Sequence, residues 1–594
     1  MLLHTATSTL VFLSICVIST NAGNPCCSYP CQNGGVCMPH SNSQYTCDCT
    51  GTEFYGQNCE TPTLLQRFKL LLRPTPETLH TWLVHNKWLW DIVNSMTFVK
   101  DFIMKMVVLI RSNIVDAPPT YTSDHEYITL DAATNLSYFT RALPPVPREC
   151  PTPMGVVGPK ILPDPKLVAE KLFRRTEFKR DALDSSVLLT FFAQHFTHMF
   201  FKTDMKKGPG FTWGGHGVDG SSVYGPDKHT ENLLRSFTDG KLKSQMINGE
   251  EWPPYVSDAP VKMLYPPSVP KDKQFALGHE FFGLLPGLLA YGAIWLREHN
   301  RVCEILKTEH PHWDDEQLFQ TTKLIIIGET IKIVIEDYVQ HLSNYHFKLF
   351  FKPELMFGQS FQYSNRISVE FNHLYHWHPL MPDNFNISGT DYKLRNFMFN
   401  TEIPVKHGMR QLVESFSSQH AGKVTFRNHG AGTMHVAVDT IKHGRELRFQ
   451  SFNQYRKRFR LKPYSSFQEL TGETEIAAEL ESLYEDIEAV EFYVGVIVER
   501  HREQSMFGGG MIEIGGPFSV KGLMANPICS PKYWKPSTFG GDVGFNIIKT
   551  ASLKKLFCKN IDGDCPLVSL KVPQTVSEAQ ANEKCDSQCS KNEL

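Results

Sequence analysis

The sequence predicts a mainly α-helical protein in which a small disulfide-rich module precedes a larger helical body. Two long stretches, residues 318–342 and 471–500, repeat apolar side chains with the spacing of a helix. Seven of the 15 cysteines lie between Cys26 and Cys59, whereas only two occur from residue 60 to 528. Because a small domain needs crosslinks and a large core does not, this distribution separates a stapled module from the body.

Composition excludes two classes of protein. The chain has 594 residues, of which 41% are hydrophobic, so it can bury a large core and is not generally disordered. Its 60 Lys and Arg residues against 62 Asp and Glu residues give a net charge of −2. Without an overall positive field, we expect no nucleic-acid partner.

Residues 1–23 are interpreted as a secretory signal peptide. An apolar run from Leu10 to Ile18 precedes small and polar residues, and this run is too short to span a bilayer. At the other end, the tail of residues 576–594 finishes in Lys-Asn-Glu-Leu594, which resembles an endoplasmic reticulum retrieval signal with a substitution inside it. We therefore expect a protein of the secretory pathway that resides in the lumen of the endoplasmic reticulum.

Residues 24–60 contain the cysteine cluster, with the spacing Cys47-x-Cys49 followed by Tyr55-Gly56-x-x-Cys59. This spacing resembles an EGF-like module, which uses six cysteines. The resemblance implies the internal bridges Cys26–Cys37, Cys31–Cys47 and Cys49–Cys59, and it leaves Cys27 to pair with Cys150, the next cysteine of the chain. Each bridge would stabilise a domain with so small a core by about 2–4 kcal/mol.

Residues 61–115 are predicted to form short amphipathic helices. Thr75 and Pro76 suit the cap and first position of one helix, and Arg111 lies at the end of the segment. Apolar residues recur on helical stripes and tryptophans stand beside cations, in the set Leu64, Leu65, Phe68, Leu71, Leu72, Trp82, Trp88, Trp90, Phe98, Phe102 and Met106. Such helices suit a segment that lies in one leaflet of a membrane, or a helical hairpin that packs on the body, and the pattern leaves both open.

The body, residues 116–575, begins at the turn Asp116-Ala-Pro-Pro119. Its longest apolar region, residues 281–296, is interrupted by glycine and proline, so we expect no transmembrane helix. Asn135 and Asn386 each begin an Asn-x-Ser sequence and are expected to carry glycans.

Two histidine patterns in the body suggest redox chemistry. Tyr375 and His378 are three residues apart, and Gln194 and His198 are four apart, so each pair shares a face if its segment is helical. A haem-ligating histidine beside a tyrosine would place an oxidisable ring near iron, and an amide beside an imidazole could bind and deprotonate a peroxide. The same histidines could also be zinc ligands or core residues, and spacing alone does not choose between these interpretations.

Several longer motifs carry a family resemblance. They are Phe192-Ala-Gln-His-Phe-Thr-His198, Ala290-Tyr-Gly-Ala-Ile-Trp-Leu-Arg-Glu-His-Asn-Arg-Val302, Leu374-Tyr-His-Trp-His-Pro-Leu380, Pro517-Phe-Ser-Val-Lys-Gly-Leu523 and Ile528-Cys-Ser-Pro531. With the EGF-like cysteines, they resemble the prostaglandin endoperoxide synthases, or cyclooxygenases, of the animal haem peroxidase superfamily. The resemblance implies that residues 116–575 form one large haem peroxidase-like catalytic domain.

The resemblance also implies the catalytic residues. His378 would be the axial ligand of the haem iron, and His198 and Gln194 would form the peroxidase site on the other face. Tyr375 would form the radical that takes hydrogen from a polyunsaturated fatty acid, most plausibly arachidonate. Oxygen would then add to give the hydroperoxy endoperoxide, which is reduced at the haem with a reducing cosubstrate. No Asp directly precedes His198, so we expect a non-covalent haem b, one per subunit.

The remaining expectations concern the substrate channel and the partners. Arg111 would bind the fatty-acid carboxylate, with Tyr345 and Glu513 at the channel mouth. The channel would be lined by Tyr338, Val339, Phe371, Trp377, Gly515, Ser519 and Leu523, where Ser519 is the hydroxyl that aspirin acetylates in the family. The resemblance further implies a Cys558–Cys565 bridge, a homodimer and monotopic attachment to the lumenal membrane face.

Two other functions stay open from the sequence. A related haem dioxygenase would make lipid hydroperoxides without closing the endoperoxide ring. A non-enzymatic adhesion protein would carry the EGF-like module on a degenerate peroxidase body, although the retained Gln194, His198 and His378 argue against it.

Overall fold

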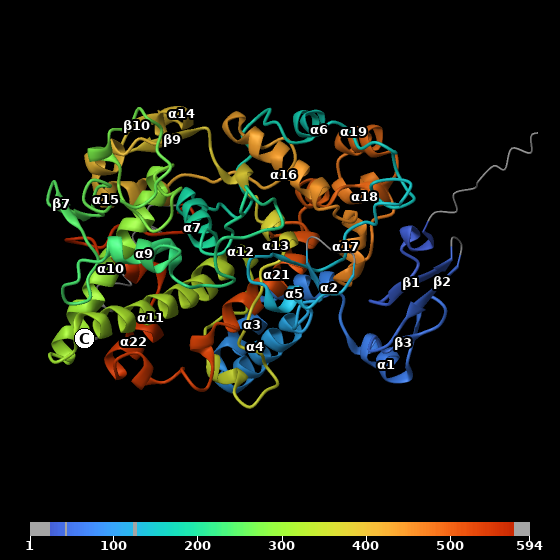
Figure 1. The fold of residues 1–594 in the computed structure, drawn as a ribbon, viewed down its shortest axis with the longest axis horizontal. Helices are drawn as coiled ribbons and strands as arrows, with labels where there is room; N and C mark the ends of the chain where they lie inside the picture. The colour runs from blue at the N-terminus through green and yellow to red at the C-terminus, as the bar shows by residue number, and fades with distance from the viewer. Residues whose placement is uncertain (1–23, 42–43, 123–126, 575–594) are drawn as a thin grey trace, which may run out of the picture.

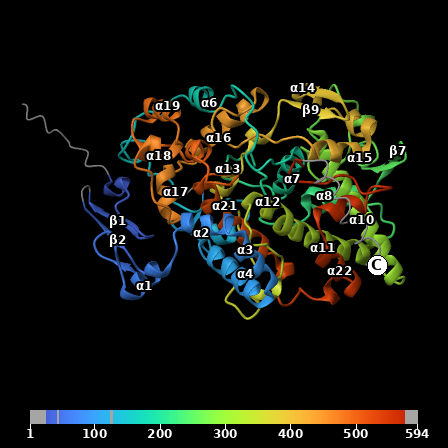
Figure 2. The ribbon, with the colours of Figure 1, turned by 180° about the vertical axis from the view of Figure 1, so that it is seen from behind.

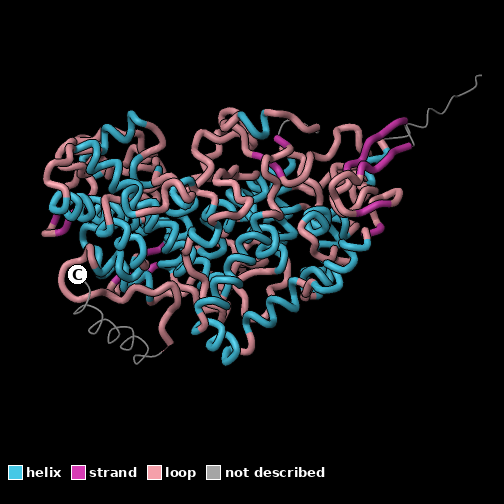
Figure 3. Tube along the Cα trace, turned by 90° about the horizontal axis from the view of Figure 1, so that it is seen from below, coloured by secondary structure: helices cyan, strands magenta, loops and turns pink. Residues whose placement is uncertain are grey.

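A computed structural model describes residues 24–41, 44–122 and 127–574. The predicted signal peptide, and the tail with Cys585 and Cys589, lie outside the described residues. Figures 1 and 2 show a small module with β-strands at one end of a large helical body, and Figure 3 shows helices throughout that body. The predicted mainly α-helical fold is confirmed.

The module is held by its disulfides. A short 3-10 helix, Pro25–Ser28, precedes the antiparallel hairpin of β1 (Val36–Ser41) and β2 (Gln44–Asp48) and the short pair of β3 (Phe54–Tyr55) and β4 (Thr61–Pro62). The structure contains the expected disulfides Cys26–Cys37, Cys31–Cys47 and Cys49–Cys59. Cys27 joins Cys150 of the body, so the module is covalently tethered to it.

Four consecutive helices connect the module to the body. They are α1 (Leu64–Leu72), α2 (Pro76–Val84), α3 (Lys87–Ser95) and α4 (Thr97–Ser112). Thr75 caps α2, as expected, because its hydroxyl accepts the amide hydrogen of Thr78. The predicted apolar stripes point outward, and Leu64, Leu71 and Phe98 are 81–88% exposed. These helices therefore leave an apolar face uncovered, while Met104 and Val108 of α4 are buried in the core of the body.

The body is assembled from many short elements around one core. In chain order they are β5 (Tyr121–Thr122), α5 (Asp131–Thr134), β6 (Thr140–Arg141), α6 (Pro165–Leu172), α7 (Val187–Thr197), α8 (Ser221–Tyr224), α9 (Lys228–Leu234), β7 (Gln245–Ile247), β8 (Glu250–Trp252), α10 (Pro286–Glu309), α11 (Asp315–Ile333), a π-helical turn (Val334–Val339), α12 (Gln340–Ser343), α13 (Val369–Leu374), β9 (Asn384–Ile387), β10 (Thr390–Lys393), α14 (Leu394–Phe397), α15 (Glu402–Ser417), α16 (Met434–Glu446), α17 (Phe452–Arg458), α18 (Phe467–Thr471), α19 (Thr474–Tyr484), α20 (Phe492–Val498), α21 (Gly509–Met524), α22 (Asp542–Thr550) and α23 (Leu553–Cys558). Short 3-10 turns at Lys271–Lys273, Pro353–Met356, His378–Leu380, Ala431–Thr433, Ile487–Ala489, Pro527–Cys529 and Pro536–Thr538 connect them. Cys558 forms the expected bridge with Cys565.

The interrupted apolar run, residues 281–296, begins in a turn before Pro286 and continues as the first part of α10, which is buried along most of its length. Gly287 is needed there because a Cβ atom would lie 2.1 Å from the Phe191 ring of α7. In the described part of the chain, none of the helices has the length and apolar character required to cross a bilayer.

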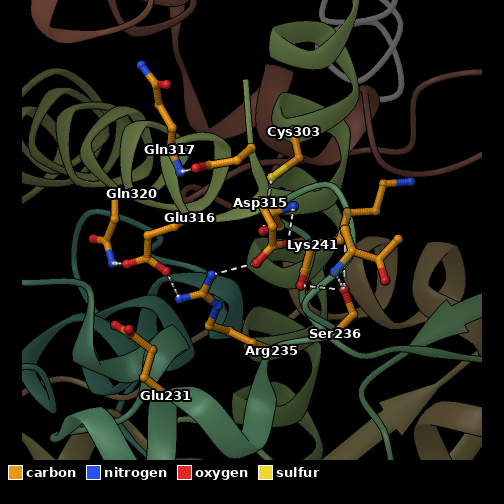
Figure 4. Close-up of polar contacts among 12 residues, drawn as sticks. Glu231, Arg235, Ser236, Lys241, Cys303, Asp315, Glu316, Gln317 and Gln320 are labelled. Carbon is orange, nitrogen blue, oxygen red and sulfur yellow. Dashed lines mark hydrogen bonds and ion pairs between the residues drawn. The ribbon is translucent and has the colours of Figure 1, made fainter. Parts of the chain in front are cut away.

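The start of α11 is fixed by charged side chains (Figure 4). Asp314 caps the helix by accepting the Gln317 amide hydrogen at 2.8 Å. Arg235, at the end of α9, donates to Asp315 at 2.7 Å and also to Glu316. Carboxylates in the first turn of a helix interact favourably with the helix dipole, so these charged residues stabilise the start of α11.

The two long periodic stretches have different outcomes. Residues 318–342 are helical throughout, as α11, the π-helical turn and α12. Residues 471–500 are not one helix, since they contain the end of α18 followed by α19 and α20. Gly472 and Glu485 take positive φ values of 72° and 61°, which end α18 and α19.

Candidate functional site

Helix α7 carries Gln194 in its last turn, and His198 directly follows the helix as its C-cap. From residue 187 to 200 these are the two positions that are not fully buried, which agrees with a shared face four residues apart. His198 Nδ1 lies 2.6 Å from the Gln194 carbonyl, so Nδ1 carries the hydrogen and Nε2 keeps its lone pair. Burial lowers the pKa of His198 to about 4, so its imidazole is neutral and able to accept a proton.

The turn after α13 carries Tyr375 and His378. Ser368 caps α13, and the helix ends at Leu374. Burial is the main cause that lowers the pKa of His378 well below its usual value, and the charges of His376, His429 and His198 add to it. A neutral imidazole is the form that ligates a metal.

Tyr375 lines a small apolar cavity. The lining residues are Phe196, Phe200, Gly217, Val218, Val334, Val339, Asn365, Ile367, Phe371, Tyr375, Phe518, Ser519, Gly522 and Leu523. Of the seven expected channel residues, the cavity therefore includes Val339, Phe371, Ser519 and Leu523.

The other three expected channel residues lie around this cavity. The Tyr338 hydroxyl is 3.4 Å from the Tyr375 hydroxyl, and Trp377 stacks on the Tyr375 ring at 4.0 Å between centroids. Gly515 lies behind Leu374, whose Cδ1 would be 3.1 Å from an added Cβ. Burial raises the pKa of Tyr375 to about 12, partly offset by hydrogen bonds with Tyr338 and Ser519, so the phenol keeps its proton.

Arg111, at the end of α4, meets Glu513 of α21. Arg111 Nη1 donates to one carboxylate oxygen of Glu513, and Arg502 Nη1 donates to the other at 2.8 Å. Burial opposes ionisation of Glu513, but the two arginines outweigh it and hold its pKa below the usual value. Both arginines act on the pKa of Tyr345, so the three expected residues form one cluster. The link between Arg502 and Glu513 was not expected from the sequence.

Comparison with known proteins agrees with this geometry. The family model for animal haem peroxidase matches residues 212–566. Prostaglandin G/H synthase 2 of Oryctolagus cuniculus is 58% identical over 565 residues, covering 95% of this chain and 93% of that protein. Prostaglandin G/H synthase 1 of Rattus norvegicus is 56% identical over 564 residues, covering 94% and 93%.

This chain belongs to the prostaglandin G/H synthase family of animal haem peroxidases. Its fold extends beyond that family. The crystal structure of Oryza sativa fatty acid alpha-dioxygenase matches with a TM-score of 0.63 at 16% identity, covering 86% of this chain and 99% of that one.

Membership of the prostaglandin G/H synthase family implies a haem cofactor, and the residues present fit one. His378 is half-buried with a neutral ring, and its buried Nδ1 has no hydrogen-bond partner among the described residues, which leaves Nε2 as the ligating atom. Gln194 Oε1 is likewise buried without a partner there. The zinc interpretation lacks support, because the described residues contain no group of three or more His, Cys, Asp or Glu placed to hold a metal ion.

Two further histidines of this chain lie beside the predicted ones. The His279 ring is 4.9 Å from His198, and the His429 ring is 6.2 Å from His378, both between centroids. Neither stands at a helical spacing from a predicted residue, so no sequence pattern indicated them. Each is at most 2% exposed.

Proposed function

We propose that this protein is a bifunctional haem enzyme that converts arachidonate and oxygen to the prostaglandin hydroperoxy endoperoxide and then reduces it to the hydroxy endoperoxide. Identity of 56–58% over nearly the whole chain supports this function. The observation that carries it is the turn after α13, where Tyr375 faces the apolar cavity while His378 stands among the neutral histidines.

The peroxidase part uses the residues of α7 and of the turn. A non-covalent haem b, one per subunit, would be held by His378 and would supply peroxide reduction and an oxidising equivalent for a nearby phenol. His198 Nε2 would accept the proton of the bound hydroperoxide and return it to the departing oxygen. The Gln194 amide would orient the two peroxide oxygens. A reducing cosubstrate would complete the cycle.

The oxygenase part uses Tyr375. Once oxidised to a neutral phenoxyl radical, Tyr375 would take a hydrogen atom from the substrate, which regenerates the phenol and leaves a carbon radical that combines with two molecules of oxygen. The peroxyl radical that results would take a hydrogen atom back from the Tyr375 phenol, which gives the hydroperoxide and restores the phenoxyl radical. The hydroxyl of Tyr338 orients the Tyr375 ring, and Trp377 supports its face. The apolar lining, with Val339, Phe371, Ser519 and Leu523, would hold the fatty-acid chain.

Arg111 would bind the substrate carboxylate through a charge-assisted hydrogen bond. Glu513 would then keep Arg502 as its counter-charge. Tyr345 would complete the mouth.

Membrane attachment, glycosylation and dimer formation are parts of the same proposal. The outward apolar residues of α1 to α4 support monotopic insertion into the lumenal leaflet of the endoplasmic reticulum membrane. Asn135 and Asn386 are exposed, which suits glycosylation. A homodimer is proposed from the family alone.

The test is oxygen uptake on arachidonate with product analysis by mass spectrometry. Tyr375→Phe should abolish oxygen uptake but leave peroxide reduction, because the phenol is needed for hydrogen abstraction alone. Unchanged uptake would refute the radical role. Hydroperoxides without prostaglandin-type rings would instead support the related fatty-acid dioxygenase.

A further inference from the structure

A pocket of about 240 Å³ lies beside α21, next to the cavity that Tyr375 lines. Ser519 and Leu523, four residues apart on α21, line the cavity, whereas Lys521 lines the pocket. Phe518 lines both, so the two spaces are neighbours that share one ring as a wall. Apolar side chains from several other segments complete the pocket, and they are Ile114, Val115, Pro118, Leu136 and Phe459.

Lys521 is a buried cation that lacks a partner in this pocket. The residue is 6% exposed, and among the residues that the structure describes no carboxylate or carbonyl accepts a hydrogen bond from its ammonium group. The ammonium group lies 5.6 Å from the centroid of the Phe361 ring, and burial lowers its pKa. Lysine is almost never buried unless it is paired, because an ammonium group in an apolar site loses its hydration. Lys521 therefore requires an anion that the described side chains do not supply.

The other charged residues of the pocket lining are already engaged. Arg458 pairs with Asp116 at 2.9 Å, and Asp116 is the one carboxylate among the lining residues. Arg141 and Arg366 donate to backbone carbonyls, which satisfy their hydrogen bonds but do not neutralise their charge. The lining therefore carries four cationic side chains against one carboxylate, which favours an anionic ligand.

We propose that this pocket binds a compact organic carboxylate, which pairs with Lys521 while its apolar body lies against Phe459 and Phe518. An apolar lining with one charged group that fixes the orientation is typical of small-molecule sites. The volume of about 240 Å³ is below the roughly 300–1,000 Å³ of pockets for drug-sized ligands, so the ligand is smaller than those. Arg111 is not among the lining residues, so this site is distinct from the proposed carboxylate site at the channel mouth.

The test is a fluorine NMR titration of the full-length protein with 4,4-difluorocyclohexanecarboxylate. All variants carry Arg111→Gln, so that the channel mouth does not contribute to binding of the probe. Lys521→Met should raise Kd about tenfold or more, because it removes one charge-assisted hydrogen bond and keeps the length of the side chain. Lys521→Arg, which keeps the charge, should stay within about threefold of the Lys521 protein. The neutral analogue (4,4-difluorocyclohexyl)methanol should bind at least about tenfold more weakly than the carboxylate.

Lys532→Gln is the matched control and should leave Kd unchanged. Lys532 also lies over an aromatic ring, that of Tyr533 at 5.3 Å, but it is exposed and outside the pocket. The inference is overturned if the carboxylate does not bind, if Lys521→Met binds it as tightly as the Lys521 protein, or if the neutral alcohol binds equally well. If Lys521→Met does not fold, Lys521→Gln is measured by the same criteria. None of these outcomes depends on oxygen uptake, so the proposed function is tested separately.

Discussion

Arg111→Gln tests the proposed carboxylate site at the channel mouth. The side chain of Arg111 is 21% exposed and that of Glu513 is 7% exposed, so a charge pair there is poorly screened. Arg502 bonds the second oxygen of Glu513, so a substrate carboxylate can take over Arg111 without leaving Glu513 unpaired. The net gain is one charge-assisted hydrogen bond, worth about 1.5–3 kcal/mol. At about 1.4 kcal/mol per factor of ten, KM for arachidonate should rise about 10- to 150-fold.

The assay is initial oxygen uptake across a range of arachidonate concentrations, with peroxide reduction measured in parallel. Because Arg111 would bind the substrate far from the reacting carbon, kcat and peroxide reduction should stay unchanged. Arg111→Lys should fall between Gln and wild type, since it keeps the charge but not the guanidinium fork. Arg174→Gln, which removes an exposed arginine paired with Glu170, is the control and should leave KM unchanged. An unaltered KM in Arg111→Gln would refute the carboxylate role.

Three further predictions concern stability and attachment. Burial raises the pKa of Asp337 to about 6, so the folded state holds a proton that the unfolded chain, with a pKa of roughly 3.9, has lost, and stability falls as pH rises through this window. The free energy of unfolding of Asp337→Asn should therefore exceed that of the wild type by roughly 2–3 kcal/mol above about pH 7 and match it below about pH 4, as measured by unfolding at both pH values. An equal difference in the free energy of unfolding at the two pH values would contradict this explanation. Replacing Cys27 and Cys150 with serine should cost about 2–4 kcal/mol and speed proteolysis between module and body, whereas unchanged unfolding would show that the tether is dispensable. Replacing Leu71 and Phe98 with lysine removes about 1.5–3 kcal/mol of apolar burial each, so flotation with vesicles should fall at least about 100-fold, and wild-type flotation would argue against membrane insertion.

Local patterns in the sequence predicted the short helices within residues 61–115 and the helical stretch 318–342. Thr75 and Pro76 begin α2 because a hydroxyl cap and a residue without an amide hydrogen both suit a helix start. The same kind of reasoning failed for residues 471–500, since apolar periodicity reports which side is buried and not whether the chain turns. The left-handed conformations of Gly472 and Glu485 divide that stretch.

The candidate site likewise contains some residues that the sequence pattern indicated and others that it did not. The spacing of Gln194 and His198 indicated their common face, because residues four apart on a helix lie on the same side of it. Arg502 and His279 gave no such signal, since each reaches its neighbour through packing between segments far apart in the chain.

By itself, the sequence determined the mainly helical character, the division into module and body, and the helical spacing of Gln194 and His198. These depend on local hydrogen bonding and on residue spacing. The helical spacing expected for Tyr375 and His378 is wrong, because α13 ends at Leu374. Only the tertiary structure decided that Ser519 lies beside Tyr375, that Arg111 and Arg502 share Glu513, and that His429 lies beside His378. Those contacts join distant segments, and which faces meet depends on how the whole core packs rather than on any local pattern.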